Sequence, residues 1–181
     1  MKRSEINAVI GEARQAFERH GWTLPPKPRW DVTDFGLGDF NTAGLTVVNL
    51  AEQPEYCEKV MYVRHNQVTP CHYHAVKKED IICRWGRLVI ELPSSTPVRI
   101  QVNGEWQDIP KDRRLLLASG ERVTLTKGVL HAFWADSPYA VVGEVSTAND
   151  DAHDNYFENK RVGRFCKVDE DEPAIMKLVS D

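Results

Sequence analysis

The sequence contains no hydrophobic run that approaches the roughly 18 residues of a membrane-spanning helix. It also has no excess of basic residues, since the formal net charge is -4, so no general basic field that would attract nucleic acid is expected. The N-terminal residues lead into a charged amphipathic segment and lack the apolar centre of a signal peptide. These absences favour a cytoplasmic protein whose partner is a small polar molecule, without nucleic acid or membrane.

Cysteine is scarce and unpaired. The four cysteines, at positions 57, 71, 83 and 166, form no Cys-x-x-Cys pair, so reduced thiols are expected and no disulfide framework is indicated. Cys71 is next to His72 and should point to the opposite face of their predicted strand, which removes it from the candidate ligands. Internal repeats and low-complexity tracts are also absent from the sequence.

The N-terminal part of the chain predicts one helix. Residues 4–20 have Ser4 as a favourable N-cap, and their apolar residues recur at the spacing of one helix face. Gly21 should end this helix, and prolines at positions 25, 26 and 28 prevent its resumption. The polar segment over residues 30–44 shows no periodicity and is predicted to be an ordered loop around the core.

From residue 45 to about residue 145 the pattern changes to short strands separated by turn signals. Asn103-Gly104 is the clearest hairpin signal among these turns. Closely spaced short strands are typical of a β-sandwich or a jelly-roll barrel. The predicted strands are Leu45–Leu50, Glu58–Arg64, Gln67–His72, Asp80–Trp85, Leu88–Leu92, Val98–Val102, Arg114–Ala118, Val123–Thr126, His131–Trp134 and Ala140–Val145.

After residue 145 the chain becomes polar and acidic. It closes with a charge run over residues 169–173, which is expected to be a solvated surface segment. A length of 181 residues fits one domain that can bury a substantial core without disulfide bonds. The expected organisation is therefore a single domain over 1–181, with an N-terminal helix within 1–21, a β-core over 45–145 and a C-terminal segment over 146–181 that packs on the core.

A His-x-His pair is the most informative pattern in the β-region. Side chains alternate along a strand, so His72 and His74 share one face. Glu79 follows shortly after them, and His131 can add a third imidazole from a distant strand. Three His and one Glu form a mixed nitrogen and oxygen set that suits Mn, Fe, Ni, Co or Zn rather than Ca or Mg. The sequence therefore predicts a metal site in a β-barrel.

The spacing of these residues resembles the cupin superfamily. Its first motif, His-x-His, three or four residues, Glu, six residues and Gly, is matched from His72 through Glu79 to Gly86. The second motif is matched at Gly120, Gly128 and His131, while Asn66, Thr126 and Ala135 depart from the usual residues at turn and strand-end positions. The expected fold class is all-β, a cupin-type jelly-roll β-barrel with an N-terminal α-helix.

Four further polar residues are candidates for chemistry, and their local patterns leave two interpretations open. Lys77 either reaches a substrate from the ligand-bearing turn or lies on the surface of that turn. Lys59 either points inward or caps its strand end in water, and its pattern slightly favours water. Glu144 lies at the end of an apolar strand and is either a general base near the metal or an exposed strand-end residue. Asp154 lies among acids and amides that also favour turns for local reasons.

The whole set of motifs resembles the D-lyxose isomerase family of cupins. The segments that carry this resemblance are Glu58-Lys59, His72 to Ile81, Gly128 to Trp134, Gly143 to Ser146 with Asn149-Asp150-Asp151, Asp154-Asn155-x-Phe157 and Asp169 to Pro173. The resemblance implies Mn²⁺ bound by His72, His74, Glu79 and His131, with Lys59 and Lys77 as active-site lysines. Glu144 is the first candidate for the catalytic carboxylate, followed by Asp154 and Glu172.

The resemblance also implies an activity, the interconversion of D-lyxose and D-xylulose. Because D-mannose shares its upper stereocentres with D-lyxose, D-mannose and D-fructose are expected as a second pair. Proton transfer through a cis-enediol is the expected route, with a metal-assisted hydride shift as its alternative. Co²⁺, Ni²⁺, Fe²⁺ or Zn²⁺ would also fit the donor set. A homodimer is expected at the level of the superfamily. Two other functions use similar ligands, a metal-dependent cupin dioxygenase and a non-catalytic sugar-binding cupin.

Overall fold

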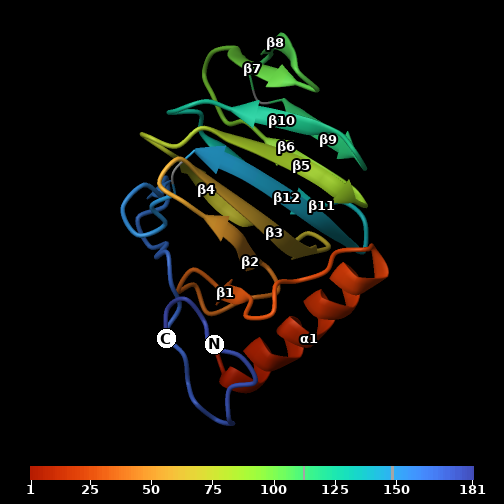
Figure 1. Cartoon of the computed structure of the whole chain (residues 1–181). Helices are drawn as coiled ribbons and strands as arrows, with labels where there is room; N and C mark the ends of the chain where they lie inside the picture. The colour runs from red at the N-terminus through yellow and green to blue at the C-terminus, as the bar shows by residue number, and fades with distance from the viewer. Residues whose placement is uncertain (112, 148) are drawn as a thin grey trace.

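The structure is a computed structural model that describes residues 1–111, 113–147 and 149–181. Within these ranges the chain forms one helix, α1 (Arg3–Arg19), and two antiparallel sheets (Figure 1). The larger sheet contains β1 (Arg29–Thr33), β2 (Leu45–Glu52), β3 (Tyr56–Arg64), β5 (Glu79–Trp85), β7 (Val98–Val102), β8 (Glu105–Ile109), β10 (Arg122–Leu125) and β12 (Tyr139–Thr147). The smaller sheet contains β4 (Thr69–Tyr73), β6 (Arg87–Glu91), β9 (Arg114–Ala118), β11 (His131–Ala135) and β13 (Tyr156–Phe157).

Successive strands alternate between the two sheets over most of the chain. The larger sheet has the order β1-β2-β3-β12-β5-β10-β7-β8, and the smaller one has β13-β4-β11-β6-β9. This alternation is typical of a double-sheet jelly roll. The expected β-fold with an N-terminal helix is confirmed, but the expected barrel is wrong, because the two sheets do not close into one. In the described part of the chain no continuous ladder joins the edges of the two sheets, and edge strand β1 instead meets the C-terminal segment through a Trp30–Leu178 bridge.

The main hydrophobic core lies between the sheets, because alternate residues of each strand point inward. On β12, Val142 enters this core, whereas Val141 faces the other side of the sheet. Glu144 is two residues beyond Val142, so the same alternation directs its carboxylate inward. The largest core side chains include Met61, Ile81, Leu88, Ile90, Ile100 and Phe133.

Helix α1 covers the outer face of the larger sheet. The predicted apolar face is confirmed, and it packs on Val48, Val60 and Val141 of β2, β3 and β12. The buried residues of this face are Ile6, Val9, Ile10, Ala13, Ala16 and Phe17. The helix ends as predicted before Gly21, whose φ of 78° is a conformation that glycine adopts without a steric cost.

The start of α1 differs from the prediction. Lys2 occupies the N-cap position, and the Glu5 carboxylate accepts a hydrogen bond from the Lys2 amide at 2.8 Å. Ser4 lies inside the first turn and donates its hydroxyl to Asp171 at 2.7 Å. Glu170 bonds Arg3 of this turn, where the helix dipole favours negative charge, and Glu172 accepts a hydrogen bond from Asn7 of the next turn. The closing acidic run is therefore at the surface, as predicted, but it is bonded to the helix.

Three strands are absent from the sequence prediction, each for a physical reason. Strand β1 falls in the predicted loop over residues 30–44; four of its five residues are buried, so its sequence shows no alternation. Strand β8 has the opposite pattern, with all but its last residue exposed. Strand β13 has two residues and exists through pairing with β4. The hairpin that joins β7 to β8 is confirmed, since Asn103 and Gly104 both have positive φ, as a tight primed turn requires.

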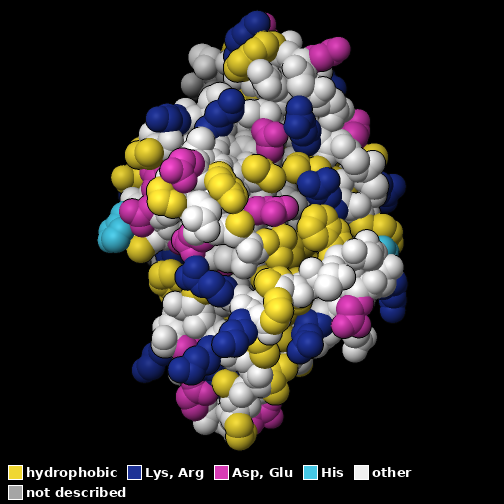
Figure 2. Space-filling model, viewed as in Figure 1, with side chains coloured by type: hydrophobic (Ala, Val, Ile, Leu, Met, Phe, Trp, Pro, Cys, Tyr) yellow, Lys and Arg dark blue, Asp and Glu magenta, His cyan; other side chains and the backbone are white. Residues whose placement is uncertain are grey.

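The surface carries charges of both signs. Figure 2 shows acidic and basic side chains interspersed with hydrophobic ones across the visible face, in line with the small net charge of -4. Within the described ranges, no helix has the length and apolar character needed to cross a membrane.

We predict that Ile10→Ala will lower the free energy of unfolding by about 2–5 kcal/mol, the usual cost of removing a fully buried aliphatic side chain. Ile10 is 0% exposed between α1 and the sheet. Gln15→Ala, at an exposed position of the same helix, should change stability by less than about 0.5 kcal/mol. Urea unfolding followed by circular dichroism measures both variants, and equal effects would contradict the packing described here.

Candidate metal centre and active site

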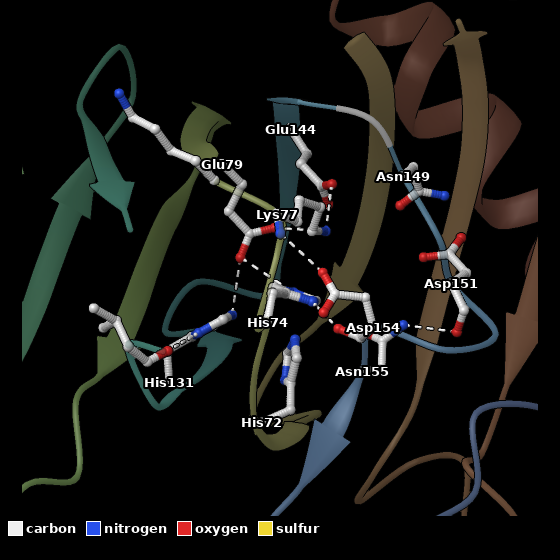
Figure 3. A network of polar contacts seen from close by, with 12 residues as sticks. His72, His74, Lys77, Glu79, His131, Glu144, Asn149, Asp151, Asp154 and Asn155 are labelled. Atoms are coloured by element: carbon white, nitrogen blue, oxygen red, sulfur yellow. Dashed lines mark hydrogen bonds and ion pairs between the residues drawn. The ribbon is translucent and has the colours of Figure 1, made fainter. Parts of the chain in front are cut away.

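Three imidazoles converge at one end of the core. His72 lies in β4, His74 directly follows that strand, and His131 begins β11 beside it, in register with His72. One ring nitrogen of each histidine lies within 4.8 Å of the others, and all three side chains are buried. Figure 3 shows the three rings grouped below Glu79. The structure thus brings together the histidines that the sequence singles out.

Each imidazole is held in one orientation by a backbone carbonyl. The Nδ1 atoms of His72, His74 and His131 donate hydrogen bonds to the carbonyls of Pro70, Asp154 and Val129, at 2.8, 2.5 and 3.0 Å respectively. Since Nδ1 carries the proton, Nε2 of each neutral ring is an acceptor that faces the site. Metal-binding histidines are commonly oriented in this way by the atom that holds their other nitrogen.

Glu79 adds a carboxylate to the same point. It is the first residue of β5, and its Oε1 lies 3.4 Å from His74 Nε2 and 3.2 Å from His131 Nε2. All three atoms are buried without a hydrogen-bond donor. Acceptors that face one another at these distances repel unless a proton or a cation lies between them. The three histidines can therefore form a metal site, and Glu79 lies where a fourth ligand would.

The pKa shifts of His72 and Glu79 favour metal binding at neutral pH. Burial, together with the nearby His131 and His74, holds the pKa of His72 well below its usual value of 6.5. Burial alone would raise the pKa of Glu79, but the facing Lys77 ammonium outweighs it and holds that pKa well below its usual value. A neutral imidazole and an ionised carboxylate are the forms that bind metal ions.

Lys77 is buried inside the site rather than on the surface of its turn. Its Nζ lies 2.7 Å from Glu79 Oε2 and 2.9 Å from Glu144 Oε1, and its side chain is 5% exposed. Burial lowers the pKa of Lys77, but the two carboxylates outweigh burial and raise the pKa above its usual value. Lys77 is therefore a permanent ammonium between two carboxylates, as Figure 3 shows.

Glu144 and Lys59 lie side by side on paired strands of the larger sheet. Strand β12 places Glu144 opposite Lys59 of β3, and their charged atoms are 3.8 Å apart. The interpretation of Lys59 as a solvated strand end is wrong, because the residue is 4% exposed. The exposed alternative for Glu144 is wrong for the same reason, at 6% exposure. Both side chains follow the inward alternation of their strands.

A second group of charges reaches the same cavity through Lys59, Asp151 and Arg164. Lys59 donates to Asn149 at 2.9 Å and to Asp151 at 3.0 Å. Arg164 Nη2 lies 3.2 Å from Asp151 and 2.6 Å from Asp31 of β1. Of these residues, Asn149 and Asp151 belong to segments that the family resemblance includes, whereas the local sequence around Asp31 and Arg164 carries no signal of a site.

The other two candidate carboxylates are directed away from the cavity. Asp154 is buried, but its carboxylate accepts hydrogen bonds from backbone amides of residues 75–77. Glu172 accepts a hydrogen bond from Asn7 of α1 at 2.6 Å and is exposed at the opposite side of the sheet from the core. Of the three carboxylates proposed from the sequence, Glu144 is the one that lines the cavity.

The cavity combines these charges with an apolar wall. Its polar lining comes from the three histidines and from Thr69, Glu79, Lys77, Glu144, Lys59, Asp151, Asn155 and Arg164. Its apolar lining comes from Phe35, Leu45, Val47, Met61, Ile81, Phe133 and Phe157. A concave site with convergent polar groups at one wall is typical of small-molecule binding, and the many polar groups suit a hydroxyl-rich ligand.

The fold is shared with sugar isomerases of known structure. The L-ribose isomerase of Cellulomonas parahominis, solved with L-ribose, matches with a TM-score of 0.74 and 18% identity over 93% of this chain and 98% of that chain. The L-ribose isomerase of Geodermatophilus obscurus matches with a TM-score of 0.72 and 19% identity, over 92% and 98%. These TM-scores establish a common fold, the antiparallel two-sheet fold that this chain shares with these L-ribose isomerases.

The family is established by sequence. A sequence profile of D-lyxose isomerase matches residues 27–181. The D-lyxose/D-mannose isomerase of Escherichia coli O157:H7 is 36% identical over 100% of this chain and 98% of that protein. The D-lyxose/D-mannose isomerase of Serratia proteamaculans is 35% identical over 96% of this chain and 94% of that protein. The chain belongs to the D-lyxose isomerase family, and it is an isomerase.

We predict that His131→Ala will weaken Mn²⁺ binding by at least about 100-fold, since loss of a ligand should cost more than the 10–100-fold typical of residues that only orient one. His65→Ala, which removes an exposed imidazole bonded to the Ser137 carbonyl, is the control and should bind Mn²⁺ like the wild type. Isothermal titration calorimetry on chelator-treated protein measures both affinities. Unchanged binding in His131→Ala would refute the metal centre.

Proposed function

We propose that the chain is a metal-dependent aldose–ketose isomerase that interconverts D-lyxose and D-xylulose, and D-mannose and D-fructose as a second pair. The observation that carries the proposal is Lys77 held between Glu79, beside the three imidazoles, and Glu144 on the opposite side. This arrangement sets a candidate proton-transfer carboxylate next to a fixed positive charge and a metal site. The relatives from Escherichia coli O157:H7 and Serratia proteamaculans are named D-lyxose/D-mannose isomerases, which supports D-lyxose and D-mannose as the two aldose substrates.

The metal ligands in this proposal are His72, His74, Glu79 and His131. Their mixed nitrogen and oxygen donors suit Mn²⁺, our first choice, as well as Co²⁺, Ni²⁺, Fe²⁺ or Zn²⁺. A bound divalent cation would stabilise negative charge on the sugar oxygens next to the reacting carbons. A homodimer and a cytoplasmic location, both expected from the sequence, stay predictions.

The reaction moves two protons within the sugar. The sugar is neither oxidised nor reduced overall, because the aldose and the ketose are isomers. The C2 proton of the open-chain aldose is removed and a proton is delivered to C1, while the O2 hydroxyl proton moves to O1. Glu144 is the group we assign to carbon proton transfer, because among the cavity carboxylates without a metal-ligand role it is the one beside Lys77, whereas Asp151 pairs with Lys59 and Arg164. The Lys77 ammonium, 2.9 Å from Glu144, stabilises the negative charge that develops on the sugar oxygens of the enediolate.

In this proposal the remaining hydroxyl groups of the sugar are bound by the polar groups of the cavity that lie away from the histidines. Lys59 and Arg164 are donors, and Asp151 and Asn155 supply acceptors. Arg164 Nη1 is buried without a hydrogen-bond partner, so a substrate hydroxyl there would satisfy it. An open-chain sugar carries several hydroxyls at fixed stereochemistry, and a wall of fixed charges discriminates among them better than an apolar wall does.

The direct test is an anaerobic incubation of Mn²⁺-loaded protein with D-lyxose, followed by an assay for D-xylulose. We expect ketose to form, to disappear after chelation and to be absent in His74→Ala, since His74 is one of the three converging imidazoles. Oxygen consumption with an apolar substrate would instead support the dioxygenase alternative. Saturable sugar binding without product would support the non-catalytic alternative, and both results would overturn the isomerase.

We predict that Glu144→Gln will lower kcat by about 10²- to 10⁴-fold, the usual contribution of a general base, while Mn²⁺ binding persists. Glu58→Gln is the matched control, because Glu58 lies next to Lys59 on β3 and points to the opposite face. In D₂O, wild-type turnover should place solvent deuterium at C1 of D-xylulose. Deuterium at C1 would count against a hydride shift, and a Glu144→Gln variant with wild-type kcat would exclude Glu144 as the proton carrier.

A further inference from the structure

The loop between His74 and Glu79 is held at its two ends by the body of the protein. The His74 carbonyl accepts a hydrogen bond from the Gly128 amide at 2.7 Å, and the Thr147 amide donates to the Lys78 carbonyl at 3.0 Å. Between these anchors Val76 at the tip is 63% exposed, and the loop reaches the interior through the buried Lys77 side chain. The amides of residues 75–77 therefore need another partner to fix their positions.

Asp154 supplies that partner from the C-terminal segment. Its Oδ1 accepts from the Ala75 amide at 2.8 Å, its Oδ2 accepts from the Lys77 amide at 2.8 Å, and both oxygens share the Val76 amide at 3.1 and 3.2 Å. The side chain is 6% exposed and forms no ion pair within the described ranges. Consecutive amides that converge on a carboxylate form a strong anion site, because their dipoles add.

The same residue also orients one of the converging imidazoles. The Asp154 carbonyl accepts the hydrogen bond from His74 Nδ1 at 2.5 Å. His72 and His131 are oriented differently, each by a carbonyl two residues upstream in its own strand region. Of the three imidazoles, His74 is thus the one whose orientation depends on the chain beyond β12.

Asp154 is itself fixed on both sides. Its amide donates to the Asp150 carbonyl at 2.9 Å. Just after it, β13 pairs with β4, which places Phe157 opposite His72. A single residue therefore connects the C-terminal segment to His74 through its carbonyl and to the backbone of Lys77 through its carboxylate, as Figure 3 shows.

We propose that Asp154 is a positioning residue that sets His74 and Lys77 in place together, and that it takes no part in proton transfer. The inference rests on the proposed metal-dependent isomerase and adds a role that its chemistry does not require by itself. The carboxylate of Asp154 is saturated by loop amides and does not line the cavity, unlike that of Glu144.

Three variants test this role: Asp154→Ala, Asp154→Asn and the control Asp150→Asn. Asp150 is an exposed acid in the same turn whose carboxylate caps His153. We expect Asp154→Ala to bind Mn²⁺ about 10- to 100-fold more weakly, the usual effect of losing a group that orients a ligand. Its kcat for D-lyxose at saturating Mn²⁺ should also fall. Asp154→Asn keeps one acceptor oxygen and should be intermediate, and the control should match the wild type.

Hydrogen exchange of the amides at residues 75–77, measured without metal, separates this role from the others. Faster exchange in Asp154→Ala alone, together with weaker Mn²⁺ binding, is the expected result. Wild-type Mn²⁺ affinity and exchange in Asp154→Ala would overturn the proposal. A loss of kcat with unchanged affinity and exchange, equal in both Asp154 variants, would assign proton transfer and also overturn it. If the wild type has no isomerase activity, the proposed function fails while affinity and exchange still decide the role of Asp154.

Discussion

Lys77 lies between the carboxylates of Glu79 and Glu144, 2.7 and 2.9 Å from their oxygens, and all three side chains are buried. Charges so far from water are stable only in pairs, because each unpaired one would cost several kcal/mol of desolvation. Charges of alternating sign continue from Glu144 through Lys59, Asp151 and Arg164 to Asp31. Removing any one of these charges would therefore leave a neighbouring charge buried and unpaired. The rest of the site depends on this series of alternating charges.

The series of alternating charges connects parts of the chain that lie far apart in sequence. The central strands supply the histidines and Glu144, whereas Asp151, Asp154 and Arg164 come from the segment that follows β12. That segment is in turn held at the other side of the molecule, where the buried Arg3 of α1 binds Glu170 and Asp181. The segment after β12 therefore contributes Arg164 to the charge network and also binds Arg3 of the helix. A displacement of this segment would therefore also displace groups beside the metal site.

Much of the fold and part of the site could be predicted from local sequence. The period of the apolar residues gives the helix, the alternation gives most strands, and the His-x-His spacing gives a shared face for two imidazoles. Strand β1 could not be predicted, because four of its five residues are buried and its alternation disappears. Asp31 and Arg164 could not be predicted either, since each is a common charged residue whose role comes from meeting the other at 2.6 Å.

The sequence by itself determined the β-rich fold with one N-terminal helix, the family, and the residues able to bind a metal, because these depend on residue type and short spacing. The tertiary structure decided that Lys59 is buried, that Glu144 rather than Asp154 or Glu172 faces the cavity, and that the sheets do not close. Each of these outcomes depends on which distant segment fills the space beside a side chain. Only the folded chain brings those segments together, and burial then fixes which charges must pair.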